Sequence, residues 1–262
     1  MDAQKIIKEY SEGKSLNQLA KENKVYPNNI KKILLENNIK VRTRKESVIL
    51  ENQKRAKKIN HNYFSQESPN MAYLLGFYAA DGTVRKDCNE IKLTLCSIDK
   101  DFLEQIRQEL QAEREIKIYR DGKGYENSSF IFSSAQIKED FKKYNIISNK
   151  TYNFKFPTNL NKKYWIDFIR GYFDGDGTVC KSGKYLRWEL CSHERDILDK
   201  TINFFFEEYN IPKINIYQRK DGLYYFQYSE NATKQIYNIL YTPNSLFLPR
   251  KKEKFDTLIN II

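Results

Sequence analysis

The sequence predicts an α+β fold with two related halves, each in the order αββαββα, and a small all-helical domain before them. Three observations lead to this prediction. A helical segment occurs twice, 95 residues apart; alternating apolar and polar segments follow each copy; and the first 45 residues show only helical periodicity. The expected parts are a helical domain over 1–45, a basic linker over 46–69, and two repeats over 70–160 and 161–262.

The duplicated segment covers residues 73–84 (YLLGFYAADGTV) and 168–179 (FIRGYFDGDGTV). Five residues of the first copy, Gly76, Asp81, Gly82, Thr83 and Val84, recur in the second as Gly171, Asp176, Gly177, Thr178 and Val179. The same offset relates the tripeptide Leu-Cys-Ser at 95–97 to that at 190–192. An ungapped match over some thirty residues indicates an internal duplication.

Each copy is typical of the end of a helix with one apolar face. Gly177 is expected to end the second helix in the left-handed conformation that glycine adopts most easily. Asp176 then lies on the last turn, where the helix dipole already places partial negative charge. An acid at this end of a helix therefore requires a cation nearby.

Both helices also carry two small residues four positions apart, Gly76 with Ala80 and Gly171 with Gly175. This spacing places them on one helix face, where two backbones can approach closely. If the helices pack there, Asp81 and Asp176 lie side by side and offer the oxygen ligands that Mg²⁺ prefers. A single such acid is more often a solvated helix end, but two at equivalent positions favour a metal site. The apolar runs are too short to cross a membrane.

Residues 74–82 and 169–177 resemble the two signature nonapeptides of LAGLIDADG homing endonucleases of the single-chain kind. The resemblance extends over about 70–262. It implies two sheets that form a concave saddle over double-stranded DNA, and a monomer that cuts a long specific site during intron or intein mobility. It also implies two or more Mg²⁺ ions, held by Asp81 and Asp176 with the carbonyls of Ala80 and Gly175.

The sequence departs from the family pattern at one position. The acid usually found two residues before the metal-binding acid is Asp174 in the second motif but Ala79 in the first. Residues two apart do not share a helix face. We therefore expect Asp174 to have a packing or capping role.

A basic residue follows the third helix of each repeat, ahead of an apolar run. The resemblance implies a basic active-site residue here, which would stabilise the charge of the transition state or orient water. Lys150 fits in the first repeat and Lys251 in the second, where Arg250 and Lys252 are alternatives. Surface lysines in a lysine-rich chain would give the same pattern.

Alternation predicts strands at 90–97, 115–120 and 128–133 in the first repeat, and at 185–190, 213–219 and 224–228 in the second. Helices are expected at 101–110, 136–144, 196–209 and 233–240. The outward residues are basic or aromatic, which suits contacts to phosphates and base edges: Lys92, Lys117, Tyr119, Arg120, Arg187, Tyr217, Arg219 and Lys220.

Residues 1–60 contain 15 Lys and Arg against 7 Asp and Glu, whereas the rest of the chain is nearly balanced. Helices over 3–10 and 16–22, and a third that begins at Pro27, resemble a helix-turn-helix of the recombinase type. The third would present four residues to the major groove: Asn28, Asn29, Lys31 and Lys32. Arg42 and Arg44, in or near the linker, either contact DNA backbone or belong to a solvated spacer.

The four cysteines show no Cys-x-x-Cys spacing, so neither a zinc site nor a disulfide framework is indicated, and an intracellular, reducing compartment is expected. No signal peptide is visible. His193 aligns with Ile98 and is expected at the surface. The rival functions are a DNA-binding regulator or RNA-splicing maturase that has lost cleavage, and an interaction module without nucleic acid. Retention of both acids favours cleavage.

Overall fold

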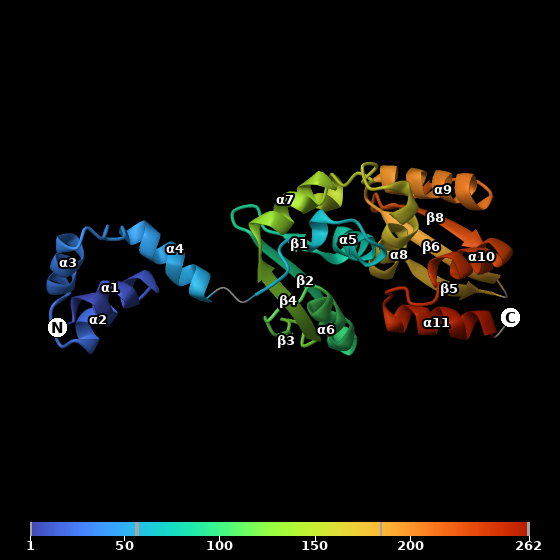
Figure 1. The fold of residues 1–262 in the computed structure, drawn as a ribbon. Helices are drawn as coiled ribbons and strands as arrows, with labels where there is room; N and C mark the ends of the chain where they lie inside the picture. Colours follow the sequence, from blue (N-terminus) through green and yellow to red (C-terminus); the bar gives the residue numbers. More distant parts are fainter. Residues whose placement is uncertain (1, 56–57, 184, 261–262) are drawn as a thin grey trace. The chain divides into compact units, whose positions relative to one another are not determined.

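The computed structural model of this 262-residue protein describes every residue except 1, 56, 57, 184, 261 and 262. The chain divides into two compact units, residues 1–57 and 58–262 (Figure 1). Each unit has its own hydrophobic core. The division falls inside the segment expected to be a basic linker, of which residues 56 and 57 lie outside the described part.

The first unit contains α1 (Ala3–Ser11), α2 (Leu16–Glu22), α3 (Pro27–Glu36) and α4 (Arg44–Arg55). The first three helices begin where the sequence predicts them. Ser15 caps α2 by accepting a hydrogen bond from the Gln18 backbone while the Gln18 side chain accepts one from the Ser15 backbone. A small core joins them: Ile6, Tyr10, Leu19, Ala20, Ile30 and Leu34.

The second unit repeats one arrangement twice. The first half contains α5 (Pro69–Asp81), β1 (Thr83–Val84), β2 (Glu90–Cys96), α6 (Lys100–Glu109), β3 (Lys117–Arg120), β4 (Glu126–Ser133) and α7 (Ala135–Lys143). The second half contains α8 (Trp165–Asp176), β5 (Thr178–Ser182), β6 (Tyr185–Ser192), α9 (Arg195–Tyr209), β7 (Tyr217–Gln218), β8 (Tyr224–Ser229) and α10 (Glu230–Leu240). The predicted α+β fold with two αββαββα halves is confirmed.

Each half forms an antiparallel four-stranded sheet, in the orders β1-β2-β4-β3 and β5-β6-β8-β7. The register places apolar residues opposite one another on the core side, for example Leu93 opposite Phe130 and Trp188 opposite Tyr228. These four side chains are buried. The alternation of β2 and β6 therefore decides which face of each sheet meets the core.

Four elements differ from the sequence-based expectation. The short strands β1 and β5, directly after the motif helices, were not located, and α11 (Pro249–Asn260) is an additional helix. The strand expected at 213–219 is reduced to Tyr217–Gln218, because β7 is an edge strand that pairs with β8 over these two positions. Alternation along one segment does not reveal how far its neighbour extends.

The motif helices α5 and α8 lie side by side in the larger unit and touch through their backbones (Figure 1). A Cβ atom placed on Gly76 would lie 2.0 Å from the carbonyl oxygen of Phe168. One placed on Gly171 would lie 1.9 Å from the carbonyl oxygen of Tyr73. The predicted contact through small residues is confirmed, and it is reciprocal between the two helices.

The expectation that Gly177 ends its motif helix in the left-handed conformation is wrong, and Gly82 adopts the same extended backbone. Gly82 has a φ of −72° and Gly177 a φ of −83°, both in extended backbone. Glycine is required at both positions because neighbouring atoms leave no room for a Cβ atom. An added Cβ at Gly177 would lie 2.0 Å from the Phe173 ring, and one at Gly82 would lie 2.5 Å from the carbonyl oxygen of Tyr78.

A single methyl group at the helix contact should destabilise the protein. Gly171→Ala is expected to lower the free energy of unfolding by about 1–3 kcal/mol, since the overpacked backbones must separate. The loss should occur although alanine favours a helix interior by ~1 kcal/mol over glycine. Denaturant unfolding measures the change.

Gly122→Ala is the matched control, because an added Cβ there has no neighbour within 4 Å. It should change the free energy of unfolding by less than about 0.5 kcal/mol. Equal stability of the Gly171 and Gly122 variants would contradict the close contact of α5 with α8.

Candidate functional site

The candidate site lies where the C-terminal ends of α5 and α8 meet. Asp81 ends α5 and Asp176 ends α8, and the glycine contacts hold these ends together. The neighbouring positions also interlock, since an added Cβ on Gly175 would lie 2.3 Å from the Ala80 methyl and 3.3 Å from Oδ2 of Asp81. The two acids that the duplication singles out are therefore adjacent in space.

Each carboxylate reaches solvent on one side, while protein surrounds it on the others. Burial, together with the negative charge of Asp176, raises the pKa of Asp81 to about 6. Burial also raises the pKa of Asp176, and Lys150 and Lys251 oppose the increase. Two like charges in one crowded place form a site that a bound cation would stabilise.

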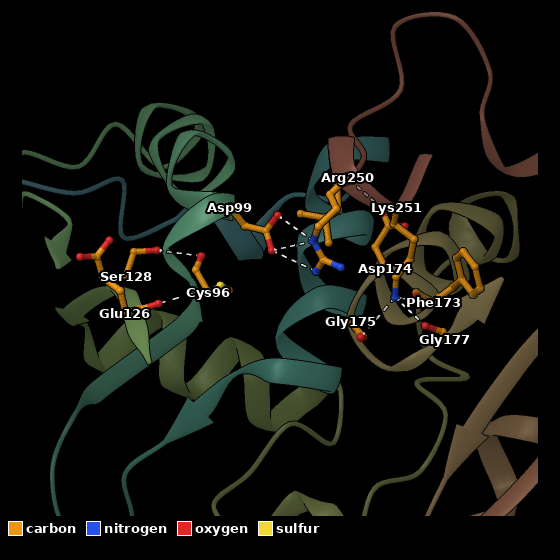
Figure 2. Close-up of polar contacts among 11 residues, drawn as sticks. Cys96, Asp99, Glu126, Ser128, Phe173, Asp174, Gly175, Gly177, Arg250 and Lys251 are labelled. Atoms are coloured by element: carbon orange, nitrogen blue, oxygen red, sulfur yellow. Dashed lines mark hydrogen bonds and ion pairs between the residues drawn. The ribbon is translucent and has the colours of Figure 1, made fainter. Parts of the chain in front are cut away.

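Two buried lysines reach the ends of the motif helices. Lys150 lies in the turn Lys150–Tyr152, and its Nζ donates to the carbonyl oxygen of Ala80 at 2.7 Å. Lys251, on the first turn of α11, donates to the carbonyl oxygens of Phe173 at 2.7 Å and Gly177 at 2.6 Å (Figure 2). Their positive charges lie at the negative ends of both helix dipoles.

Burial lowers the pKa of Lys251 to about 8 and also lowers that of Lys150. The acids Asp81 and Asp176 act in the opposite direction on both. The site thus combines two carboxylates and two ammonium groups in one crowded region. The surroundings disfavour the charged form of all four, since the pKa of both carboxyls is raised and that of both lysines is lowered.

The neighbours of Lys251 have other partners. Arg250 binds both carboxylate oxygens of Asp99 at 3.0–3.2 Å, which joins the second half to the first (Figure 2). Lys252 binds Asp256 at 2.8 Å. Of the three candidates, Lys251 is the one that reaches the motif helix.

The lysines also contact the two carbonyls expected to bind metal. Ala80 accepts from Lys150, and the carbonyl oxygen of Gly175 lies 3.4 Å from Nζ of Lys251. A carbonyl oxygen has two lone pairs, so these contacts leave one free for another partner.

Asp174 has the structural role that its helix position predicts. It is buried and accepts hydrogen bonds from the Tyr73 hydroxyl at 2.8 Å, the Tyr241 hydroxyl at 3.0 Å and the Leu248 backbone N–H at 2.8 Å. These bonds connect α8 to α5 and to the segment after α10. Asp174 is thus a buried acceptor that joins both halves.

The polar faces of the sheets contain the residues expected to contact DNA. Lys117, Tyr119 and Arg120 are exposed on β3, and Nζ of Lys92 lies 5.7 Å from the centre of the Tyr119 ring. Tyr217, Arg219 and Lys220 are exposed at β7 and just after it.

Glu189 departs from the expected pattern on β6. It points outward but is buried under Arg219, whose Nη2 donates to it at 2.6 Å, and under Gln227. Gln227 in turn accepts a hydrogen bond from Arg187 at 2.9 Å. Charge pairing across strands removes this acid from solvent, and alternation alone could not reveal that.

In the first unit, the four residues expected to contact bases are exposed on α3: Asn28, Asn29, Lys31 and Lys32. Arg44 is exposed at the start of α4. Arg42 is used inside the unit instead. Its guanidinium lies 4.0 Å from the centre of the Tyr10 ring and donates to the carbonyl of Lys14. Arg42 is therefore a packing residue, which the basic composition of this segment conceals.

His193 is the residue that sequence reasoning placed wrongly. It is half-buried, its ring centre lies 4.9 Å from that of Tyr152, and it lines one cavity with Asp176 and Lys150. The offset of 95 aligns His193 with Ile98, which is 72% exposed, so the repeat alone points to the surface.

Comparison with known proteins agrees with this architecture. Residues 68–150 match the model of the LAGLIDADG-like domain. One uncharacterized protein of Methanocaldococcus jannaschii is 29% identical over 199 residues, which cover 74% of this chain and 72% of that protein. A second from the same organism is 27% identical and covers 92% of this chain and 90% of its own length.

Among solved structures, the I-LtrWI LAGLIDADG homing endonuclease bound to target DNA is 18% identical, with a TM-score of 0.48. It covers 77% of this chain and 90% of its own chain. The paired motif helices, each followed by an antiparallel four-stranded sheet, agree with the match of residues 68–150 to the LAGLIDADG-like domain. Residues 68–150 therefore contain a LAGLIDADG-like domain.

The donor atoms at the helix ends suit a hard cation such as Mg²⁺, because carboxylate and carbonyl oxygens are its preferred protein ligands. The described residues contain no group of three or more His, Cys, Asp and Glu that could hold a metal ion. Two carboxylates are sufficient for Mg²⁺ where water or phosphate oxygens complete the shell. In the described part of the chain, no helix is both long and apolar enough to cross a bilayer.

In metal-free buffer at neutral pH, Asp81→Asn should stabilise the protein, because it removes a charge that burial and the neighbouring Asp176 disfavour. The expected gain is about 1 kcal/mol, since solvent screens part of this effect. The raised pKa means that protonated Asp81 favours folding below the unfolded value of 3.8. This contribution is lost as the pH rises through about 6. The difference in melting temperature between variant and wild type should therefore grow across this interval.

Asp87→Asn, in an exposed loop, is the control and should show no such growth. A variant Asp81→Asn that is less stable than the wild type at neutral pH would refute the electrostatic description of the site.

Proposed function

We propose that this protein is a site-specific double-strand DNA endonuclease of the homing type that hydrolyses phosphodiester bonds with Mg²⁺. One observation carries the proposal. Asp81 and Asp176 meet at the ends of two helices in backbone contact, and a buried lysine reaches each end. A solvated pair of helix ends would need neither the close approach nor the buried cations.

The residues have distinct parts in the proposed reaction. A water oxygen attacks the phosphorus atom, one phosphorus–oxygen bond of the backbone breaks, and the departing oxygen acquires a proton. Asp81 and Asp176 would hold the metal ions, with the carbonyls of Ala80 and Gly175 as further ligands. Bound Mg²⁺ supplies charge stabilisation to the attacking and departing oxygens. Lys150 and Lys251 place positive charge where negative charge develops.

The polar sheet faces would bind the duplex on both sides of this centre. Lys92, Lys117 and Arg120 in the first half and Arg187, Arg219 and Lys220 in the second suit phosphate contacts and base-edge hydrogen bonds. Tyr119 and Tyr217 add aromatic surface. Because one chain supplies both sheets, it would bind both sides of the cleavage point without a second copy. The protein would therefore act as a monomer on a long DNA site.

The first unit would form a second DNA contact, as a helix-turn-helix. Its support is the exposed polar face of α3, with Asn28, Asn29, Lys31 and Lys32 all open to solvent over a separate core. Arg44 would assist from α4. Arg42 is excluded from this role, because its guanidinium is engaged with Tyr10 and Lys14.

The alternative is a DNA-binding regulator or splicing maturase that keeps the fold without cleavage. The observation that favours it is the position of the two lysines, whose amines donate hydrogen bonds to carbonyl oxygens at the helix ends. These amines would neutralise the helix ends without a metal ion. Cleavage of a plasmid library with Mg²⁺, followed by sequencing of the new ends, separates the two functions.

Asp81→Asn and Asp176→Asn should each abolish double-strand cleavage of the selected plasmid while DNA affinity stays within about threefold. Each change removes a carboxylate from the shared centre and leaves the sheets untouched. Asp87→Asn, with an exposed loop side chain, should cut as the wild type does. Near wild-type cleavage by either site variant would refute a centre that needs both acids.

Deletion of residues 1–57 should leave a folded nuclease with weaker DNA binding and a shallower salt dependence. The cut falls there because the backbones of residues 58 and 60 bond to Glu113 and Leu110 in the larger unit. Each lost phosphate contact should reduce the slope of log K against log salt by about 0.9.

In the full chain, the double change Lys31→Ala and Lys32→Ala should reproduce part of this loss. Lys14→Ala is the control, since Lys14 is already paired with Glu9 and Glu22. An unchanged salt slope and footprint after the deletion would show that the first unit does not contact DNA.

A further inference from the structure

The two ends of the candidate centre are not equivalent. The repeats carry the same Cys-Ser pair at 96–97 and 191–192, but the next residue is Ile98 in the first half and His193 in the second. Ile98 is 72% exposed, whereas His193 is half-buried. The duplication therefore places an imidazole beside one acid and an alkyl side chain at the matching position of the other half.

His193 opens onto a cavity of about 300 Å³ that also reaches Asp176 and Lys150. This volume equals that of about ten water molecules in the liquid, so it can hold a phosphodiester group with some hydration. The cavity wall combines a carboxylate, an ammonium group, the imidazole, the Ser192 residue and the aromatic Tyr172. Such a mixture suits an anionic group that must be bound and oriented.

The ring of His193 packs against an aromatic ring that belongs to neither motif helix. Its centre lies 4.9 Å from the ring centre of Tyr152, which belongs to the same turn as Lys150. The imidazole also interacts electrostatically with Asp176. The turn that supplies the lysine thus also positions the histidine.

The first half uses its corresponding loop differently. Asp99, which follows Ile98, is buried and bound by Arg250 through both carboxylate oxygens. The loop after β2 therefore forms an ion pair through Asp99, whereas the corresponding loop after β6 presents the imidazole of His193 to a cavity. This difference between the two halves is set by their amino-acid sequences and does not depend on which DNA is bound.

We propose that His193 is a further residue of the cleavage centre that acts on one DNA strand alone, donating a hydrogen bond from its imidazole N–H to the scissile phosphate beside Asp176. The inference rests on the proposed nuclease function. Its consequence is an order of events: the strand next to Asp176 is cut first and the other strand follows. A nicked intermediate then accumulates with its break always in the same strand.

The first test needs no cleavage. The chain contains two histidines, and His61, which bonds to Ser134 at 2.8 Å, is an internal reference. Protein labelled with ¹⁵N-histidine is titrated with a short random-sequence duplex in Ca²⁺, and binding is followed by fluorescence anisotropy. The imidazole signals of His193 should shift while those of His61 stay in place. Binding without a shift at His193 overturns the proposal.

The second test measures both strands separately on the plasmid selected for cleavage. His193→Ile, which copies the other half, should slow the cutting of one strand by about tenfold or more relative to the other. His193→Gln keeps an N–H donor and should restore part of the rate. Ile98→Ala is the matched control and should change neither strand.

The outcomes separate this inference from the proposed function. If the wild type cuts no DNA, the proposed nuclease function fails, and the imidazole titration still decides whether His193 contacts phosphate. If the wild type cuts and His193→Ile slows both strands equally, or neither, the strand-specific role is wrong. Melting temperatures of all three variants should match the wild type, which excludes a folding defect as the cause of a rate change.

Discussion

The contact between the backbones of α5 and α8 is the constraint on which the rest of the structure depends. Gly76 and Gly171 leave no room for a Cβ atom, so the two helices approach to the limit that main-chain atoms allow. This closeness aligns their C-terminal ends and brings Asp81 and Asp176 together. The same contact sets the two halves against each other, so the fold of the larger unit and the geometry of its charged centre have one cause.

Placing two acids at adjacent helix ends carries an electrostatic cost, because both dipoles present negative charge there. The protein offsets it with Lys150 and Lys251, which enter from the segments after the third helix of each repeat. The lysines lose solvation in turn, and burial lowers the pKa of both. The result is a compact set of opposed charges at the ends of the two motif helices.

The two halves share a frame but differ in chemistry. Arg250 of the second half crosses to Asp99 of the first, and Asp174 accepts a hydrogen bond from Tyr73 across the helix contact. The first half has no acceptor equivalent to Asp174, because the offset of 95 aligns Asp174 with Ala79, whose side chain has no polar atom. The duplication thus accounts for the shared fold, and the differences between the copies give the centre two unequal sides.

The sequence by itself determined the duplication, the helix faces, the strand alternation and the two acids, because each depends on residue type at a fixed spacing. It predicted the small-residue contact correctly and misassigned Gly177, Arg42 and His193. The tertiary structure decided those three, since each depends on side chains or backbone that local spacing does not specify. Whether a glycine is present for its φ or for space, and whether an arginine faces solvent or a tyrosine ring, is set by neighbours that no local pattern encodes.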